Sequence, residues 1–235
     1  MSKLLVANYK MNGDLKFYKS VVKNFNKIKV KDTKIVLCPP FVYLSNFKIK
    51  NKHVSVGSQD VAGESNKKST GQTSPSMLKE FGVKYAIIGH SERREIGETD
   101  NMIALKVKHV LENEIVPIIC VGEQKKSSAL DTIIQQVKIA LTHVKEKHEI
   151  VIAYEPVWAI GSGEVPTNAR IKKVVKQILE TVKEMGLNAK CLYGGSVSEQ
   201  NFLELIKTGV DGFLLGGVSR DLDKFGKIIR GVDCE

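Results

Sequence analysis

Eight short runs of apolar, mostly β-branched residues recur along the chain, and segments with helical periodicity separate them. The runs are Lys3–Ala7, Lys34–Cys38, Val54–Ser58, Tyr85–Gly89, Val116–Val121, Ile150–Tyr154, Ala189–Tyr193 and Gly212–Gly216. Several of them are apolar at nearly every position, which is typical of strands buried on both faces of a parallel sheet. The pattern therefore predicts an α/β protein built from eight strand–helix units.

The segments between the runs carry the helical half of this pattern. The clearest covers residues 169–185, where apolar residues recur three and four positions apart. Thr167 before it is a typical N-cap, and Gly186 after it is a typical C-terminal signal. Ser74-Pro75 opens another helix in the order of a cap followed by proline. Further helices are expected over residues 14–27, 99–113, 128–145, 198–208 and 221–229, with a short one over 41–47.

Eight such units occupy almost the whole of the 235 residues, and no linker or low-complexity stretch interrupts them. The economical architecture is a closed (β/α)8 barrel that forms a single catalytic domain over residues 1–235. An open, doubly wound sheet is the alternative. It is disfavoured because eight units are many for such a sheet and because the first strand–helix turn lacks a G-x-G-x-x-G motif. In a barrel, the reacting groups lie at the carboxyl ends of the strands.

Composition disfavours several other classes of protein. The four cysteines are scattered without a C-x-x-C pair, so neither a zinc site nor a disulfide framework is indicated. No apolar run is long enough for a membrane span or a signal peptide, and together with the sparse thiols this predicts a cytoplasmic protein. The net charge of +10 reflects 36 basic and 26 acidic residues. Because the lysines are spread over predicted helices without interleaved aromatic residues, no nucleic-acid partner is expected.

The sixth strand end is the most informative one. Glu155 directly follows the run, and Pro156 ends the strand because proline cannot donate a ladder hydrogen bond. An apolar segment that ends in glycines comes next. Exposing its side chains to water is unfavourable unless the segment folds over another surface. The segment comprises Pro156, Val157, Trp158, Ala159, Ile160, Gly161, Ser162 and Gly163. It indicates a general base followed by a lid that excludes water; a core Glu with an ordinary turn is the alternative.

Other strand ends supply an imidazole, an ammonium group and glycines. His90 follows the fourth run, where a short helix can begin, and a helix N-terminus favours the neutral imidazole. Asn8 and Lys10 follow the first run. Gly194-Gly195-Ser196 and Gly216-Gly217 follow the seventh and eighth runs, where barrel enzymes commonly bind phosphate through backbone N–H groups. A core histidine, a surface lysine and two plain turns are the alternatives.

Together these groups suit one class of reaction. A base beside a hydrogen-bond donor can abstract a proton next to a carbonyl while the donor stabilises the oxyanion that forms. The sequence has no recognisable metal cluster, nucleophile elbow or dinucleotide turn, so we expect neither a metal nor a cofactor. A barrel lyase or epimerase acting on a sugar phosphate stays open, but it would need a metal set or a Schiff-base lysine. A non-catalytic binding protein also stays open, but it would have no use for the base and its lid.

The chain resembles the triosephosphate isomerase family from end to end. Six motifs carry the resemblance: Asn8-Tyr9-Lys10-Met11-Asn12, Gly89-His90-Ser91-Glu92-Arg93-Arg94, Cys120-Val121-Gly122-Glu123, residues 153–163, Tyr193-Gly194-Gly195-Ser196-Val197 and Leu215-Gly216-Gly217. The resemblance implies a (β/α)8 barrel that interconverts dihydroxyacetone phosphate and D-glyceraldehyde 3-phosphate through an enediolate. It implies no cofactor and a place in glycolysis and gluconeogenesis.

The resemblance also implies a role for each site residue. Glu155 would move a proton between the two carbons, and neutral His90 would polarise the carbonyl. Lys10, helped by Asn8, would stabilise negative charge on the bound substrate. The supporting residues would be Glu92, near Lys10, and Cys120. N–H groups around the following residues would hold the phosphate under the lid: Gly161, Ser196, Gly216 and Gly217.

The resemblance further implies a homodimer. Residues 60–73 form a polar segment that is long for a strand–helix connection, and such loops are usually functional or disordered. In the family this loop enters a partner subunit, so Thr70 is expected to contact Asn8 and Lys10 of the partner subunit. The chain departs from the family pattern in Tyr9, Ser69, Gln72, Ser162 and Glu164. Glu164 reverses the charge that is usual at the end of the lid, and none of these residues belongs to the proposed chemistry.

Overall fold

The computed structural model describes residues 2–63, 68–127, 130–160 and 164–234. Within these ranges the strands are β1 (Leu4–Asn8), β2 (Lys34–Cys38), β3 (Val54–Ser58), β4 (Val83–Ile88), β5 (Val116–Val121), β6 (Val151–Tyr154), β7 (Lys190–Tyr193) and β8 (Gly212–Leu215). The α-helices are α1 (Leu15–Phe25), α2 (Pro75–Glu80), α3 (Ser91–Glu95), α4 (Asp100–Glu112), α5 (Leu130–Ala140), α6 (Asn168–Glu184), α7 (Phe202–Ile206) and α8 (Leu222–Cys234). Short 3₁₀ helices cover Phe41–Asn46 (η1), Val157–Ala159 (η2) and Gly217–Arg220 (η3).

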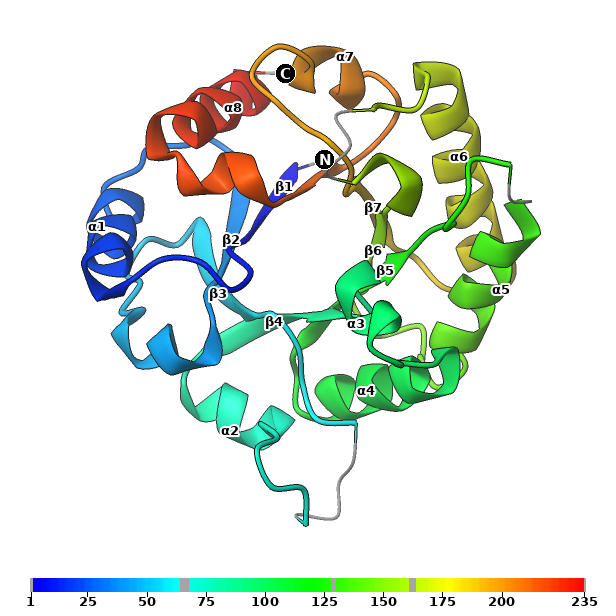
Figure 1. The fold of residues 1–235 in the computed structure, drawn as a ribbon, viewed down its shortest axis with the longest axis horizontal. Coiled ribbons are helices and arrows are strands. Elements are labelled where there is room, and N and C mark those ends of the chain that lie inside the picture. Colours follow the sequence, from blue (N-terminus) through cyan, green and yellow to red (C-terminus); the bar gives the residue numbers. More distant parts are fainter. Residues whose placement is uncertain (1, 64–67, 128–129, 161–163, 235) are drawn as a thin grey trace.

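The eight strands form a closed parallel barrel in sequence order, and the helices surround it as an outer ring (Figure 1). The barrel closes where β1 pairs with β8, with Leu4 opposite Gly212. Only glycine fits at that position, because an added Cβ would lie 1.8 Å from the carbonyl oxygen of Leu4. The predicted (β/α)8 barrel is therefore confirmed.

Two apolar layers explain why the strands are apolar at almost every position. One layer fills the barrel interior and includes Leu4, Val6, Val36, Cys38, Ile87, Ile118, Cys120, Val151, Ala153, Leu192 and Leu214. The alternate residues of the same strands point outward and pack against the helices, as Leu5, Ile35 and Ile152 do. A strand with both faces buried loses the usual alternation of apolar and polar residues.

The predicted elements are confirmed, with differences at several ends. Thr167 and Ser74 cap α6 and α2 as expected, each accepting a backbone N–H. Helix α7 starts later than predicted, because the side chain of Asn201 accepts the N–H of Ser198 and closes a turn before the helix. Helix α8 runs further than predicted, because Asp233 near its end accepts backbone N–H groups from residues 31–33.

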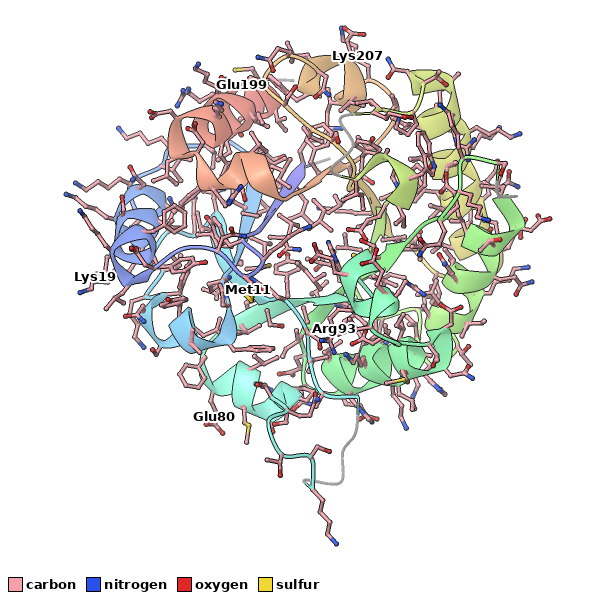
Figure 2. The ribbon with its side chains drawn as sticks, viewed as in Figure 1. Met11, Lys19, Glu80, Arg93, Glu199 and Lys207 are labelled. Carbon is pink, nitrogen blue, oxygen red and sulfur yellow. The ribbon has the colours of Figure 1, made fainter. Side chains whose placement is uncertain are left out.

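Charged side chains are distributed around the outside of the ring. In Figure 2, Lys19 on α1 and Lys207 beside α7 lie at well-separated points on the outer rim, whereas Arg93 lies nearer the centre. This distribution is that of solvated helix faces. Among the described residues, no helix combines the length and the apolar character that crossing a bilayer requires.

Candidate active site

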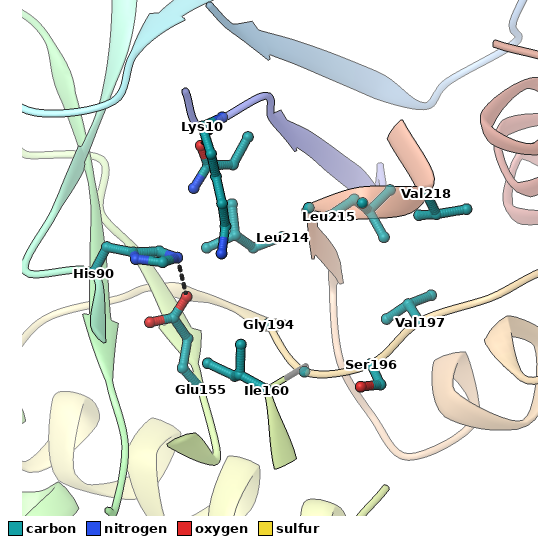
Figure 3. A pocket seen from close by; sticks show the side chains of 14 residues that line it. Lys10, His90, Glu155, Ile160, Gly194, Ser196, Val197, Leu214, Leu215 and Val218 are labelled. Atoms are coloured by element: carbon teal, nitrogen blue, oxygen red, sulfur yellow. Dashed lines mark hydrogen bonds and ion pairs between the residues drawn. The ribbon is translucent and has the colours of Figure 1, made fainter. Parts of the chain in front are cut away.

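The carboxyl ends of the strands surround a cavity of about 310 Å³. It is lined by Asn8, Lys10, His90, Glu155, Ile160, Gly194, Gly195, Ser196, Val197, Leu214, Leu215, Gly216, Gly217 and Val218. The polar groups Lys10, His90 and Glu155 lie at one end of the cavity, and Ser196 lies at the other (Figure 3). The structure therefore brings together the described residues that the sequence predicted for reaction and for phosphate binding. Gly161 lies outside the described residues.

Glu155 is held at the end of β6 by a close fit of the backbone. Its N–H donates to the carbonyl of Val121 at 2.8 Å. An added Cβ on Gly122 would lie 1.7 Å from the Glu155 carbonyl oxygen, so only glycine permits this approach. The side chain of Glu155 is 3% exposed, and its carboxylate lies 3.2 Å from Nε2 of His90 and accepts the N–H of Ser91 at 3.1 Å. Two donors thus orient a carboxylate that is almost completely withdrawn from water.

Burial raises the pKa of Glu155 above its ordinary value of 4.5, and His90, the Ser91 N–H and Lys10 oppose this shift. Cys120 is a buried neighbour whose own pKa is raised by burial and by the Glu155 charge, so its thiol stays protonated. Glu155 is therefore a stronger base than an exposed glutamate, while its neighbours still favour the ionised form.

The raised pKa predicts a pH dependence for the group. The ionised carboxylate, the form that can accept a proton, should be lost as the pH falls through a value above 4.5. Because the pKa of Glu155 is raised in the folded chain, the protonated form stabilises the fold at low pH. That contribution is lost as the pH rises through the raised pKa. The side-chain carboxyl resonance of Glu155 can be followed by ¹³C NMR in protein labelled at glutamate, and it is assigned by its absence in Glu155→Gln. Its chemical shift should titrate with a midpoint above the ordinary value of 4.5. Titration at or below the ordinary value would contradict the prediction.

His90 is oriented by the start of α3. Its Nδ1 accepts the backbone N–H of Glu92 at 3.2 Å, so the ring caps the helix. A nitrogen that accepts a hydrogen bond carries no proton, which leaves the proton of the neutral ring on Nε2. Nε2 faces Glu155 and the cavity (Figure 3). The neutral imidazole predicted from the sequence is therefore consistent with the geometry, as a donor pointing into the site.

Lys10 is placed by an unusual backbone conformation. Its φ of 49° lies in the left-handed region, which costs energy for a residue with a Cβ. Asn8 Oδ1 accepts the Lys10 N–H at 3.0 Å, and Gln59 donates to the Lys10 carbonyl at 3.0 Å. The Lys10 ammonium then pairs with Glu92 at 2.7 Å. Asn8 thus contacts the backbone of Lys10, and Glu92 contacts its ammonium group.

The described part of the predicted lid lies beside the cavity. Residues Pro156–Ile160 follow Glu155, and Ile160 lines the cavity. Ser196 Oγ donates to the carbonyl of Ala159 at 3.1 Å, which joins this segment to the loop after β7. Ser162 and Gly163, like Gly161, lie outside the described residues. Thr70 is exposed and belongs to the long loop before α2.

Two arginines near the site had no role in the sequence prediction. Arg94 joins the ends of β4 and β5 by donating to the carbonyls of Gly89 at 2.8 Å and Cys120 at 3.0 Å. Arg170 pairs with the buried Glu123 at 2.8 Å. A sequence signal for Arg170 existed, because a cation in the first turn of a helix opposes the helix dipole. Among the described residues, no group of three or more His, Cys, Asp or Glu side chains is placed to hold a metal ion.

A closed barrel with a carboxylate, an imidazole and an ammonium group around one carboxyl-end cavity defines a barrel enzyme with acid–base groups. Comparison with known families narrows this class. A model of the family described as triosephosphate isomerase matches residues 3–232. The chain therefore belongs to the triosephosphate isomerase family.

Individual relatives agree with this assignment. The chain is 38% identical to a triosephosphate isomerase of Dictyoglomus turgidum, over 97% of this chain and 98% of the relative. It is 39% identical to one of Wolbachia pipientis, over 99% and 95%. It is also similar to the enzyme of Emericella nidulans, with 37% identity over 91% and 92%. In each comparison the similarity extends over more than nine tenths of both chains.

Proposed function

We propose that this chain is a triosephosphate isomerase whose reaction is carried out by Glu155, His90 and Lys10, with Asn8 in support. The enzyme interconverts dihydroxyacetone phosphate and D-glyceraldehyde 3-phosphate, a step of glycolysis and gluconeogenesis. The observation that carries the residue roles is the buried contact of 3.2 Å between Glu155 and Nε2 of His90, in a cavity that Lys10 also lines. A base and a neutral donor at this distance can act on adjacent carbon and oxygen atoms of one substrate.

The proposed chemistry is a proton transfer through an enediolate. Glu155 removes a proton from the carbon beside the carbonyl, the C–H electrons form a C=C bond, and the carbonyl electrons move to oxygen. His90 donates its Nε2–H to that oxygen, and Lys10 stabilises the negative charge. A substrate oxygen that accepts the Nε2–H releases one oxygen of Glu155 from His90. Nε2 of His90, which has given up its proton, then takes the hydroxyl proton on the first carbon, and the O–H electrons form the new C=O bond. The C=C electrons at the same time take the proton back from Glu155 at the neighbouring carbon.

The phosphate occupies the opposite end of the cavity in this proposal. Ser196, Gly216 and Gly217 line the cavity, and the short side chain of Ser196 and the missing side chains of the glycines let backbone N–H groups approach an anion closely. Gly161 completes the set in the proposal. The lid Pro156–Gly163 covers the phosphate and excludes water, which strengthens each charge interaction and protects the enediolate from loss of phosphate.

A coupled assay tests this function directly. Purified protein should form D-glyceraldehyde 3-phosphate from dihydroxyacetone phosphate without an added metal or cofactor. A lyase or epimerase would instead act on another sugar phosphate, and a binding protein would retain the substrate without converting it. Absence of turnover by the wild-type protein, with the substrate shown to bind, would reject the isomerase.

We also propose a homodimer, and exposed apolar side chains support it. Nine of the twelve large hydrophobic residues exposed in the described part of the chain precede β5: Met11, Leu15, Phe41, Val42, Met77, Phe81, Ile96, Met102 and Leu105. They belong to the half of the ring formed by β1 to β4 and its helices (Figure 1). A one-sided apolar surface of this kind marks an interaction site. In the dimer, the partner's Thr70 would contact Asn8 and Lys10.

The dimer predicts two different results for two matched charge insertions. Sedimentation velocity at micromolar concentration should show two chains for the wild type. Val42→Glu, which places a charge on the apolar half at a side chain that is 77% exposed, should shift the protein to one chain. Leu203→Glu, at a 41% exposed position on the other half, should leave two chains. A wild type that sediments as a single 26.0 kDa chain would contradict the proposal.

The remaining proposals concern the domain and the compartment. Residues 1–235 are taken as one catalytic domain, supported by the barrel that β1 and β8 close together. A cytoplasmic location is supported by the cysteines, because Cys38, Cys120, Cys191 and Cys234 are all free thiols. Free thiols persist in reducing compartments.

A further inference from the structure

Trp158, the only tryptophan of the chain, lies three residues after the proposed base. Its indole N–H donates to Oε1 of Glu123 at 2.9 Å. The same oxygen accepts the hydroxyl of Tyr154 at 3.0 Å and Nη2 of Arg170 at 2.8 Å. The Glu123 side chain is completely buried, so its negative charge depends on these donors. Arg170 supplies the only full positive charge among the three.

Two cations lie beside the indole, but they differ in importance. Lys126 Nζ is 5.0 Å from the ring centroid, and the guanidinium carbon of Arg170 is 5.7 Å from it. Lys126 is largely exposed and pairs with the exposed Glu164 at 3.5 Å, an arrangement that contributes little. Arg170 is more buried and pairs with a carboxylate that water does not reach. Removing the charge of Arg170 would therefore disturb Glu123 and Trp158 more than removing the charge of Lys126.

Glu123 connects Arg170 to the residues that follow Glu155. Its carbonyl accepts the N–H of Val157 at 3.1 Å, while its side chain holds Trp158. Both the backbone and the side chain of Glu123 thus fix the start of the segment after the base. A shift of Glu123 would move Val157 and Trp158 and, through Pro156, disturb Glu155.

The position of Arg170 in α6 indicates that its charge has a specific purpose. It occupies the third residue of the helix, and the first turn contains no acidic residue. A positive charge there is disfavoured by the helix dipole. The buried Glu123 carboxylate offsets the cost of a positive charge at the start of this helix. An arginine that only added charge to the surface would not need such a buried partner.

We infer that Arg170 is a positioning residue of the isomerase. It compensates the buried charge of Glu123, and Glu123 in turn fixes Trp158 and the backbone that follows Glu155. The effect on turnover rests on the proposed function, whereas the effect on Trp158 does not. Arg170 itself lines no part of the cavity that contains Glu155 and Lys10.

The test compares Arg170→Leu with Lys173→Leu. Lys173 lies on the same helix, is exposed, and has no ion pair within the described part of the chain, so it controls for the loss of one positive charge. In Arg170→Leu we expect kcat/KM to fall about tenfold with a raised KM, less than the roughly hundredfold cost of misplacing reacting groups directly. Trp158 emission should shift to longer wavelength, and quenching by neutral acrylamide should increase. Lys173→Leu should change neither property.

A second pair of variants separates positioning from folding. Arg170→Lys keeps the charge and should recover part of kcat/KM and of the emission. Adding Glu123→Gln to Arg170→Leu removes the uncompensated charge, so the two losses should be clearly less than additive. A variant that only folded less well would lower kcat at unchanged KM and leave the emission of the folded fraction unchanged.

Several results would overturn the inference. They are Arg170→Leu matching Lys173→Leu in emission and KM, an Arg170→Lys variant no better than Arg170→Leu, or fully additive losses with Glu123→Gln. An inactive wild type would reject the proposed function instead. In that case Trp158 emission would still decide whether Arg170 positions the segment.

Discussion

Glu155→Asp is expected to lower kcat by about a hundredfold while KM changes little, because a misplacement of reacting groups by about 1 Å costs that much. The shorter side chain withdraws the carboxylate by one methylene from a site that two donors now fix, His90 at 3.2 Å and Ser91 at 3.1 Å. Charge and hydrogen-bonding type are conserved, so binding of the phosphate should persist. Steady-state kinetics with dihydroxyacetone phosphate measures the effect.

The control for this variant is Glu184→Asp. Glu184 is exposed at the end of α6, and the same shortening there should leave kcat and KM unchanged. Thermal melts of both variants separate catalysis from stability. A Glu155→Asp enzyme that turned over at the wild-type rate would remove Glu155 from the role of base. A lowered melting temperature with normal turnover would make it a structural residue.

The fold was predictable because burial leaves a strong sequence signal. Val151 and Ala153 face the barrel interior while Ile152 faces the helices, so β6 is apolar throughout and stands out between helical segments. Helix ends were less predictable where side chains compete with the helix. The turn closed by the side chain of Asn201 shortens α7. The spacing of apolar residues in the sequence does not show whether this turn or a further turn of helix forms.

The site was predictable in part for a geometric reason. Parallel strands of a barrel end at one face, so residues just after them, such as Lys10, His90 and Glu155, must lie near one another. Their details were not predictable. Arg170 and Glu123 are 47 positions apart and meet because the first turn of α6 lies near the end of β5. The left-handed backbone of Lys10 depends on Asn8 and Gln59, which come from two different strand ends.

His90→Asn is expected to lower kcat by about 10²–10³, the range found when one donor to a developing oxyanion is removed. Asparagine is a good N-cap, so its side-chain oxygen can replace Nδ1 of His90 as the acceptor of the Glu92 N–H. Its side chain is too short to place a donor where Nε2 now lies, facing Glu155 and the cavity (Figure 3). The variant therefore keeps the start of α3 while removing the donor.

The comparison with His90→Ala shows which function of the ring matters. Alanine removes both the cap and the donor, so it should cost about 1 kcal/mol more stability than asparagine, the usual value of an N-cap. The two variants should nevertheless lose kcat to a similar extent, because both lack the group that faces the substrate oxygen. Calorimetric melts and steady-state kinetics measure the two effects separately. If His90→Asn kept wild-type turnover while His90→Ala lost it, the ring would serve to cap α3, and the oxyanion would have to be stabilised by Lys10 alone.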